Sequence, residues 1–454
     1  MRIDALVAEI GSTTTIVNAF SLNPKNPEFL GQGVAPTSVT DGDVAIGLNL
    51  AKVDLMRNLG ISQLEYGRFL ATSSAAGGLR MTVHGLVYDM TVKAGQEAAL
   101  GAGANIVLAT AGKLSEYDLQ DIERTKPNLI LLSGGTDYGD REVALYNCKS
   151  LLQLKALPPV IYCGNIQNQA AIKEMFENAN KQVYITENVY PRLDELNIEP
   201  IRKLIQQVFE DHITHAPGMN YIRSVVDGTI MPTPGAVMKA AQMLREIVGD
   251  LVVIDIGGAT TDIHSVTDGD EDIAALQTIP EPVAKRTVEG DLGLFVSAKM
   301  LAEKVGHDIL SKEIGADVVE VFKKYTAVPA TPEHLKLAHA LSYHAGKIAL
   351  MRHAGQLKHN YTPKGRKTHA QGKDLTAVKF LAATGGALTR LPKGIDIMKN
   401  LTNININSNM LFPKKDTIKI LTDSSYIMAS IGVLTKEYPE TAYELLKKYV
   451  IQVE

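Results

Sequence analysis

The chain has 454 residues, and 46 Lys and Arg against 50 Asp and Glu give it a formal net charge of −4. With 45% hydrophobic and 21% charged residues, it has the composition of an ordinary folded protein and enough length for two or more domains. The mild acidity argues against nucleic acid as a partner, because binding to phosphates needs concentrated Lys and Arg.

Cysteine content and hydropathy indicate in which cellular compartment the protein is expected. Cys148 and Cys163 are too few for a disulfide framework, and the N-terminus lacks the charged-then-apolar pattern of a secretory leader. The nearest approach to a membrane span, residues 98–111, is short and interrupted by Asn105. We therefore expect a cytoplasmic protein without membrane contact.

The first part of the chain alternates β-favouring runs with turn signals. Residues 5–10, 14–20 and 29–34 predict antiparallel strands. Further on, short apolar runs alternate with helix-like stretches, which predicts βαβ units around a parallel sheet. The runs are 106–110, 129–132, 160–163 and 183–186, and the helices are expected over 140–154, 167–178 and 199–212. We interpret about 105–190 as an insertion in the N-terminal half.

The second half repeats the opening pattern. After turn residues at 231–235, a helix over 236–247 leads into an apolar strand over 251–256. We place the boundary between two related halves near Gly249, giving residues 1–249 and 250–454. The later elements expected in chain order are helices over 292–305 and 332–352, a polar basic loop over 353–374, a strand over 377–383, and helices over 424–435 and 438–450.

A carboxylate, a glycine and hydroxyls follow the first strand in Glu9-Ile10-Gly11-Ser12-Thr13-Thr14. Glycine permits a tight turn with an exposed backbone N–H, hydroxyls can donate to phosphate oxygens, and a carboxylate can hold hydrated Mg²⁺. Alone, this pattern fits an ordinary hairpin turn equally well.

The second half contains the same design in Asp255-Ile256-Gly257-Gly258-Ala259-Thr260-Thr261-Asp262. One such loop in each half predicts two phosphate loops that face each other across a cleft. A further strand ends in Thr384-Gly385-Gly386-Ala387, where the backbone could approach a flat ligand closely. Taken alone, a double glycine after a strand is usually only a turn.

In order and spacing, these three motifs resemble the phosphate-1, phosphate-2 and adenosine motifs of the actin, sugar-kinase and heat-shock-chaperone ATPase superfamily. Residues 232–236 and 423–433 resemble its two connecting helices, which cross at the hinge between the halves. The resemblance implies an α/β fold of two actin-like, ribonuclease H-like domains around a nucleotide cleft.

The resemblance also implies roles for individual residues, with ATP or ADP and Mg²⁺ as ligands. Glu9 and Asp255 would hold Mg²⁺ through water, and Asp255 is the candidate general base. The phosphates would lie against Gly11, Ser12, Thr13, Thr14, Gly257, Gly258, Ala259, Thr260 and Thr261, and adenosine against Gly385 and Gly386. The superfamily usually has Asp where this chain has Glu9, so we expect slow hydrolysis.

Three further segments, 73–81, 132–137 and 286–293, resemble the MutL/GlmL family encoded alongside glutamate mutase. That family is unrelated to the mismatch-repair MutL and is taken to be an ATP-dependent chaperone or reactivating factor for adenosylcobalamin-dependent aminomutases, including ornithine aminomutase. The resemblance implies a slow ATPase whose cleft opens and closes to pull damaged cobalamin from an inactivated aminomutase. A homo-oligomer is compatible with this role.

Three other functions stay open. A small-molecule kinase would share both phosphate loops, although no acceptor-activating Asp can be singled out. An iron–sulfur activator would pool Cys148 and Cys163 of two copies around a cluster, whereas the simpler interpretation is two buried thiols. A nucleotide-binding scaffold, or a polymerising actin relative, would bind ATP without remodelling a partner.

Two segments have no assigned chemistry. Residues 352–373 hold six Lys or Arg and three His without Asp or Glu, which fits a solvated loop or a docking patch for an acidic partner or the cofactor's phosphate. His353, His359 and His369 lack metal-site spacing. The insertion lacks the Asp-x-His-x-x-Gly cobalt-ligand signature, so we expect a partner-docking surface there and no cobalamin site of the mutase type.

Overall fold

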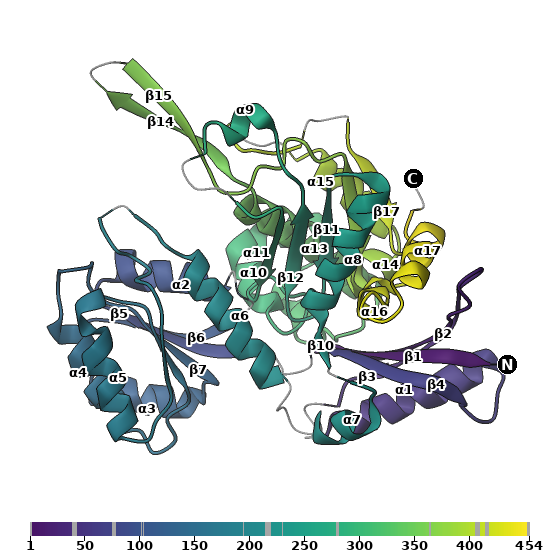
Figure 1. Ribbon diagram of the computed structural model, residues 1–454, viewed down its shortest axis with the longest axis horizontal. Helices are drawn as coiled ribbons and strands as arrows, with labels where there is room; N and C mark the ends of the chain where they lie inside the picture. Colours follow the sequence, from purple (N-terminus) through teal and green to yellow (C-terminus); the bar gives the residue numbers. More distant parts are fainter. Residues whose placement is uncertain are drawn as a thin grey trace. The chain divides into compact units, whose positions relative to one another are not determined.

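A computed structural model of the chain (Figure 1) describes residues 2–38, 43–74, 79–100, 102, 104–193, 195–213, 219–228, 230–277, 281–362, 365–404, 409–413 and 417–451. It divides into two compact units. Unit 1 comprises Met1–Gly77, Ile213–Val288 and Leu292–Glu454, and unit 2 comprises Gly78–His212 and Glu289–Asp291. In the part of the chain described, no helix has the length and apolar character needed to cross a membrane.

Unit 1 contains two five-stranded sheets with one strand order, β3-β2-β1-β4-β10 and β13-β12-β11-β16-β17. In each sheet the central strand pairs antiparallel with the next strand in the chain and parallel with a later one. This duplicated order confirms the predicted α/β fold of two actin-like, ribonuclease H-like domains. The strands are β1 Ile3–Ile10, β2 Thr14–Ser21, β3 Glu28–Pro36, β4 Tyr66–Ser73, β10 Met231–Pro232, β11 Leu251–Ile256, β12 Thr261–Val266, β13 Ala284–Glu289, β16 Phe380–Thr384 and β17 Lys419–Thr422.

Apart from Asp4, Glu9 and Asp255, the central strands are apolar because both of their faces are covered. In β1, Leu6 and Ala8 pack into a core with helix α1 (Val44–Leu59), while Ala5 and Val7 pack into a core that both sheets share. The strand β11 alternates in the same way between a core of the C-terminal half and the shared core. The sequence run 251–256 therefore looks continuous although its side chains alternate in direction.

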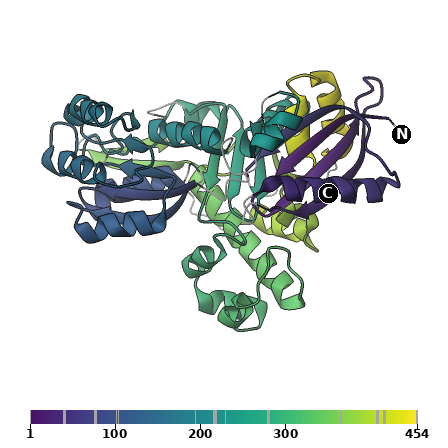
Figure 2. The same cartoon turned by 90° about the horizontal axis from the view of Figure 1, so that it is seen from below.

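Helices α8 (Thr233–Val248) and α16 (Met428–Leu434) cross in the shared core and join the two sheets. The Ala236 carbonyl of α8 lies where a side chain on Gly432 of α16 would begin, so glycine is required for this approach. Asn18 of β2 donates to Ser430 of α16 at 2.8 Å. In Figure 2 the C-terminal helices lie beside the N-terminal strands, which agrees with this contact.

Helices α1, α9, α12 and α13 of unit 1 each begin at a side chain that caps the first N–H groups. For example, the Thr331 hydroxyl accepts from the backbone N–H of His334, and Pro332 opens α13 where its missing N–H costs nothing. The helices are α1 Val44–Leu59, α7 Met219–Val225, α8 Thr233–Val248, α9 Glu271–Ala274, α10 Ala298–Val305, α11 His307–Ile314, α12 Val318–Phe322, α13 Pro332–His353, α14 Gly386–Arg390, α15 Gly394–Thr402, α16 Met428–Leu434 and α17 Pro439–Tyr449.

Unit 2 is a five-stranded parallel sheet of order β6-β5-β7-β8-β9 with its own core. The βαβ prediction is confirmed, and the segment 105–190 lies within this unit. The limits of the two predicted ATPase halves stay a prediction. The elements are β5 Leu79–Gly85, η2 Tyr88–Val92, α2 Lys93–Leu100, β6 Ala104–Ala111, α3 Glu116–Thr125, β7 Leu129–Leu132, α4 Glu142–Leu151, β8 Val160–Tyr162, η3 Ile166–Asn168, α5 Gln169–Asn178, β9 Val183–Ile185 and α6 Glu199–Ile213.

Three sequence predictions were wrong in part. The helix expected over 292–305 begins only at Ala298, because the N–H groups of Leu294, Phe295 and Val296 donate to the carbonyls of Gly257 and Gly258. The helix expected from residue 424 begins at Met428, after a turn.

The predicted basic loop over 353–374 is the third correction. It contains an antiparallel hairpin of β14 Gln356–Thr362 and β15 Gly365–Gln371. Its strands were missed because polar residues occupy both faces, so no apolar–polar alternation marks them.

We predict that Gly432→Ala destabilises the protein. A Cβ atom there would lie 1.9 Å from the Ala236 carbonyl oxygen, a backbone atom that cannot rotate away. The expected loss in unfolding free energy is about 1–3 kcal/mol, although alanine favours helix. Far-UV circular dichroism in urea can follow unfolding, since the chain has no Trp.

The matched control is Gly95→Ala in α2, where the new Cβ would first meet a rotatable side-chain methyl of Val83 at 3.0 Å. A smaller change is expected there. Equal losses for both variants would contradict the close crossing of α8 and α16.

Candidate functional site

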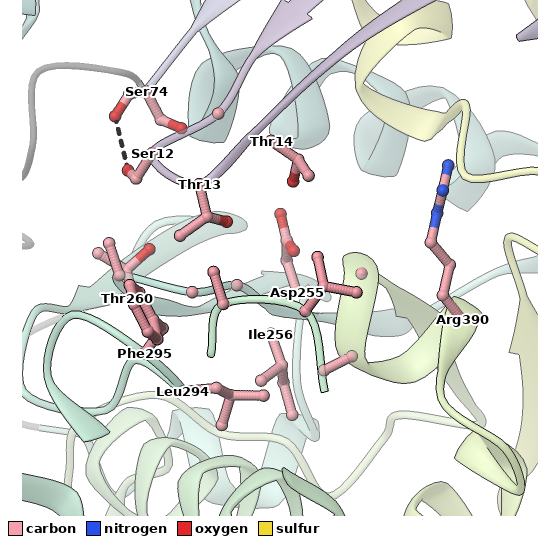
Figure 3. A pocket seen from close by; sticks show the side chains of 18 of the residues that line it. Ser12, Thr13, Thr14, Ser74, Asp255, Ile256, Thr260, Leu294, Phe295 and Arg390 are labelled. Atoms are coloured by element: carbon pink, nitrogen blue, oxygen red, sulfur yellow. Dashed lines mark hydrogen bonds between the residues drawn. The ribbon is translucent and has the colours of Figure 1, made fainter. Parts of the chain in front are cut away.

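Unit 1 contains a cavity of about 350 Å³ where the loops after β1 and β11 meet. Its wall includes Glu9, Asp255 and the N-terminal residues Thr233 and Pro234 of α8. Figure 3 shows Ser12, Thr13 and Thr14 on one side of the cavity and Leu294 on the other. The two predicted loops therefore belong to one site.

The loop between β1 and β2 is a tight turn held by its neighbours. The Gly11 N–H donates to the Thr14 carbonyl at 2.9 Å, and the Ser12 hydroxyl donates to the Ser74 carbonyl at 3.0 Å. The Thr37 hydroxyl donates to the Gly11 carbonyl at 2.8 Å. The loop is thus preorganised before any ligand is present.

The loop between β11 and β12 has the same geometry. The Gly257 N–H donates to the Thr260 carbonyl at 2.9 Å, which matches the bond within the first loop. A Cβ atom on Gly258 would lie 2.6 Å from the Thr13 side chain, so the two loops touch at this point. Glycine at 258 allows two hairpins from separate sheets to line one cavity.

Glu9 and Asp255 occupy equivalent places, each one residue before the end of its central strand. Burial raises the pKa of Glu9 to about 8, and the nearby Asp255 carboxylate adds to this effect. Burial also raises the pKa of Asp255 to about 7, with a contribution from Asp423. Arg390 lowers the pKa of Glu9, but by less than burial raises it. The site therefore gathers carboxyl groups whose ionisation is unfavourable unless a cation binds beside them.

Glu9 is only 4% exposed, and its Oε1 accepts from the Tyr426 hydroxyl at 3.0 Å. Its Oε2 is buried without a hydrogen-bond partner in the described part of the chain. A buried carboxylate oxygen without a partner is costly unless a ligand completes it. This oxygen fits hydrated Mg²⁺ as that ligand.

Asp423 and Tyr426 contribute to the site although sequence reasoning gave them no role. Asp423 accepts from the backbone N–H groups of Ile427 and Met428 and from the Thr384 hydroxyl at 2.8–2.9 Å. Tyr426 follows at a φ of 52°, in the left-handed region. The available signal was Asp423 after an apolar strand and before a helix, which is the N-cap pattern.

Much of the remaining cavity lining is apolar, and part of it lies beside the second loop, where the Phe295 N–H donates to the Gly258 carbonyl at 2.8 Å. The rings of Phe295 and Tyr325 lie 6.5 Å apart, and Tyr325 also packs edge-on against His334. The apolar lining consists of Leu294, Phe295, Tyr325, Ala327, Val328, Pro329, Leu335, Ala338, Ala387 and Leu391. Arg390 lies at the rim, over the ring of Tyr426.

Most predicted site residues line this one cavity: Glu9, Gly11, Ser12, Thr13, Thr14, Asp255, Gly257, Gly258, Ala259, Thr260 and Gly386. Thr261 is buried behind the wall, where its hydroxyl donates to the Leu292 carbonyl. Gly385, at a φ of 84°, packs against Asp255 so closely that a Cβ would lie 2.3 Å from its Oδ1.

The three segments that resemble the MutL family are only partly at the site. Ser74 lines the cavity, and Gly293 packs against Ala259 of the second loop. Residues 75–78 are outside the described residues. Residues 132–137 lie in unit 2, where the Ser133 hydroxyl donates to the Thr91 carbonyl and Asp137 accepts from Asn188.

Both cysteines are buried in unit 2, and burial raises the pKa of the Cys148 thiol to about 12. Buried thiols that resist ionisation cannot reach a second copy to hold a cluster. Within the described residues, no group of three or more His, Cys, Asp or Glu side chains is placed to bind a metal ion. Any cation at Glu9 and Asp255 therefore needs water and ligand oxygens as well.

Some solved structures have a distant likeness to the chain. The nucleotide-free diol dehydratase-reactivating factor is 11% identical, with a TM-score of 0.37, over 97% of this chain and 100% of that chain. Xylulose kinase from Bifidobacterium adolescentis is 12% identical, with a TM-score of 0.27, over 99% and 96%. At these values neither likeness bears on function.

Sequence comparison is decisive for the family. The family model described as MutL protein matches residues 5–450. Protein MutL of Clostridium tetanomorphum is 37% identical over 463 residues, which cover 99% of this chain and 99% of that protein. The chain therefore belongs to the MutL protein family.

Proposed function

We propose that the protein is a slow, Mg²⁺-dependent ATPase that reactivates an adenosylcobalamin-dependent aminomutase of the glutamate mutase or ornithine aminomutase type. The observation that carries the proposal is the pair of matching hairpin loops, one from each sheet of unit 1, around a single cavity. Membership of the MutL family and its association with glutamate mutase indicate the partner class.

The polarity of the cavity suits a nucleoside triphosphate. Backbone N–H groups and hydroxyls of the two loops would bind the phosphates, and the N-terminus of α8 adds a favourable dipole. The base would lie against the apolar lining, which includes Phe295 and Tyr325, and against Gly386, as the sequence predicts. One ligand with an anionic part and a flat apolar part would match both kinds of lining.

Hydrolysis needs positioning and charge neutralisation more than covalent chemistry. Glu9 and Asp255 would hold Mg²⁺ through water, and Mg²⁺, when bound, would neutralise charge on the transferred phosphoryl group. Asp255 would also orient the attacking water and accept its proton. A pKa of about 7 suits that role near neutral pH.

Coupling to the partner follows from the way unit 1 is joined. The loops belong to separate sheets, and the sheets meet through α8 and α16. If ATP and ADP favour different angles between the sheets, the affinity for a partner that binds one arrangement better changes with each turnover. The partner would then be bound and released in turn. Such motion would let the protein extract damaged cobalamin.

The first test measures phosphate release from Mg·ATP with and without an aminomutase whose cobalamin has been inactivated, while mutase activity is followed. We expect hydrolysis stimulated by the mutase and recovery of its activity. The control is Asp255→Asn, which should bind ATP with an affinity within about tenfold of the wild type but hydrolyse it about 100-fold more slowly or worse.

Several outcomes would oppose the proposal. Hydrolysis that ignores the mutase, or that needs a small-molecule acceptor, favours a kinase. ATP-dependent sedimentation without mutase recovery favours a scaffold. Full activity in Asp255→Asn would remove the role proposed for that carboxylate.

Glu9 predicts a pH effect on stability without Mg²⁺ or nucleotide. Between its ordinary pKa of 4.5 and about 8, the unfolded chain ionises Glu9 while the folded protein keeps the proton, so stability falls as pH rises. Glu9→Gln cannot ionise and should gain stability over the wild type from pH 5 to pH 8, on the order of a few kcal/mol. A difference in melting temperature between Glu9→Gln and the wild type that stays constant from pH 5 to pH 8 would contradict a raised Glu9 pKa.

The apolar lining also predicts weak discrimination between bases. Among the described residues the lining includes no Asn or Gln, and its carboxylates Glu9, Asp255 and Asp262 lie on the strands that carry the loops. With no carboxamide to hydrogen-bond the base edge, we expect calorimetric Kd values for ATP and GTP within about tenfold of each other. Phe295→Ala should weaken both. A preference above about a hundredfold would show that polar groups select the base.

A further inference from the structure

The strands β14 Gln356–Thr362 and β15 Gly365–Gln371 form a basic arm. Its base is anchored where the Ala370 N–H donates to the Leu276 carbonyl at 2.9 Å and the Leu357 N–H donates to the Asn409 carbonyl at 2.7 Å. Beyond these bonds the two strands pair with each other and extend away from β11 and β12 (Figure 1).

Several hydrogen bonds of Lys373 and Asp374 hold the base of the arm. The Lys373 ammonium, 3% exposed, donates to the carbonyls of Thr267, Pro282 and Val283 at 2.6–3.1 Å. Asp374 accepts from the Asp270 N–H at 2.7 Å. A two-stranded ribbon is marginal by itself, so this anchor explains how the arm holds its direction.

The two strands of the arm collect positive charge. They carry Lys358, Arg366 and Lys367 and no Asp or Glu, in a chain of net charge −4. These three side chains are exposed, and within the described residues none of them forms an ion pair. The Arg366 guanidinium contacts the His359 ring.

The strand register gathers like charges on one face. Lys358 is paired with His369, and Lys367 is two residues away from His369 on the same strand, so these three side chains share a face. Like charges on neighbouring strands repel. Elsewhere the exposed cations are often paired within a helix, as in Lys323 with Glu320 and Lys447 with Glu444.

We infer that the arm is a docking element for an acidic, carboxylate-rich surface of the partner enzyme, an inference that rests on the proposed function. The reason is charge complementarity. Because the cations of the arm form no ion pairs within the described residues, carboxylates on the partner would supply the opposite charge. A nucleic acid could also supply counter-charge, but the acidity of the whole chain opposes that class.

The experiment measures the Kd of the full chain with Mg·ATP for a purified glutamate mutase holoenzyme at about 50 and about 200 mM salt. Lys358→Glu with Lys367→Glu should weaken binding about tenfold or more at the lower salt and flatten the salt dependence. Lys358→Gln with Lys367→Gln should fall between. Basal ATP hydrolysis should not change, because neither residue lines the cavity.

The matched control reverses two other exposed lysines, Lys312→Glu with Lys324→Glu, with the same change in net charge. Equal weakening by both pairs, or none by the arm pair, would overturn the inference while leaving the proposed function intact. A wild-type protein that fails to bind the mutase would overturn both. Tighter binding of a labelled DNA duplex than of the mutase would assign the arm to nucleic acid.

Discussion

Glu9 and Asp255 place two carboxyl groups at the ends of two buried central strands, where burial opposes their ionisation, and the rest of unit 1 is arranged around this constraint. Tyr426 donates to Glu9, and Asp423 adds its own charge to the pKa shift of Asp255. Protein groups in the described part of the chain leave Glu9 Oε2 without a partner. We expect buried carboxyl groups of this kind to favour binding of a cation and of the ligand that carries it.

The crossing of α8 and α16 connects these carboxyl groups to the packing between the two sheets. Both helices start beside the site, since Thr233 opens α8 at the cavity wall and Asp423 caps α16. Both also pack in the core that joins the sheets. A change in ligand charge at the strand ends therefore acts directly on the helices that join the two sheets. This is the physical basis of the proposed coupling between hydrolysis and a partner.

The parts predictable from sequence were those with local signals. Apolar runs followed by glycine and hydroxyls predicted the strands β1, β2, β11 and β12 and their loops, because a turn between two strands needs few long-range contacts. The duplicated pattern also predicted the duplicated fold.

What sequence could not supply was set by distant contacts. Helix α10 starts late because residues 294–296 hydrogen-bond to the loop after β11. Tyr426 lies at the site because its left-handed backbone conformation and its hydrogen bond to Glu9 place it there, although Glu9 is more than four hundred residues away in sequence. The arm of β14 and β15 was missed because no apolar face marks its strands. The compact unit 2 extends beyond the predicted insertion since β5 and α6 belong to the same unit.

The most direct test of this account is calorimetric titration of Mg·ATP into the wild type, Thr13→Ala, Thr260→Ala and the double variant. The two loops should act on one ligand, so we expect one ATP per chain, weaker binding in each single variant, and an effect in the double variant that differs from the sum. Two independent sites, strictly additive effects, or no ATP binding would contradict a shared nucleotide cavity.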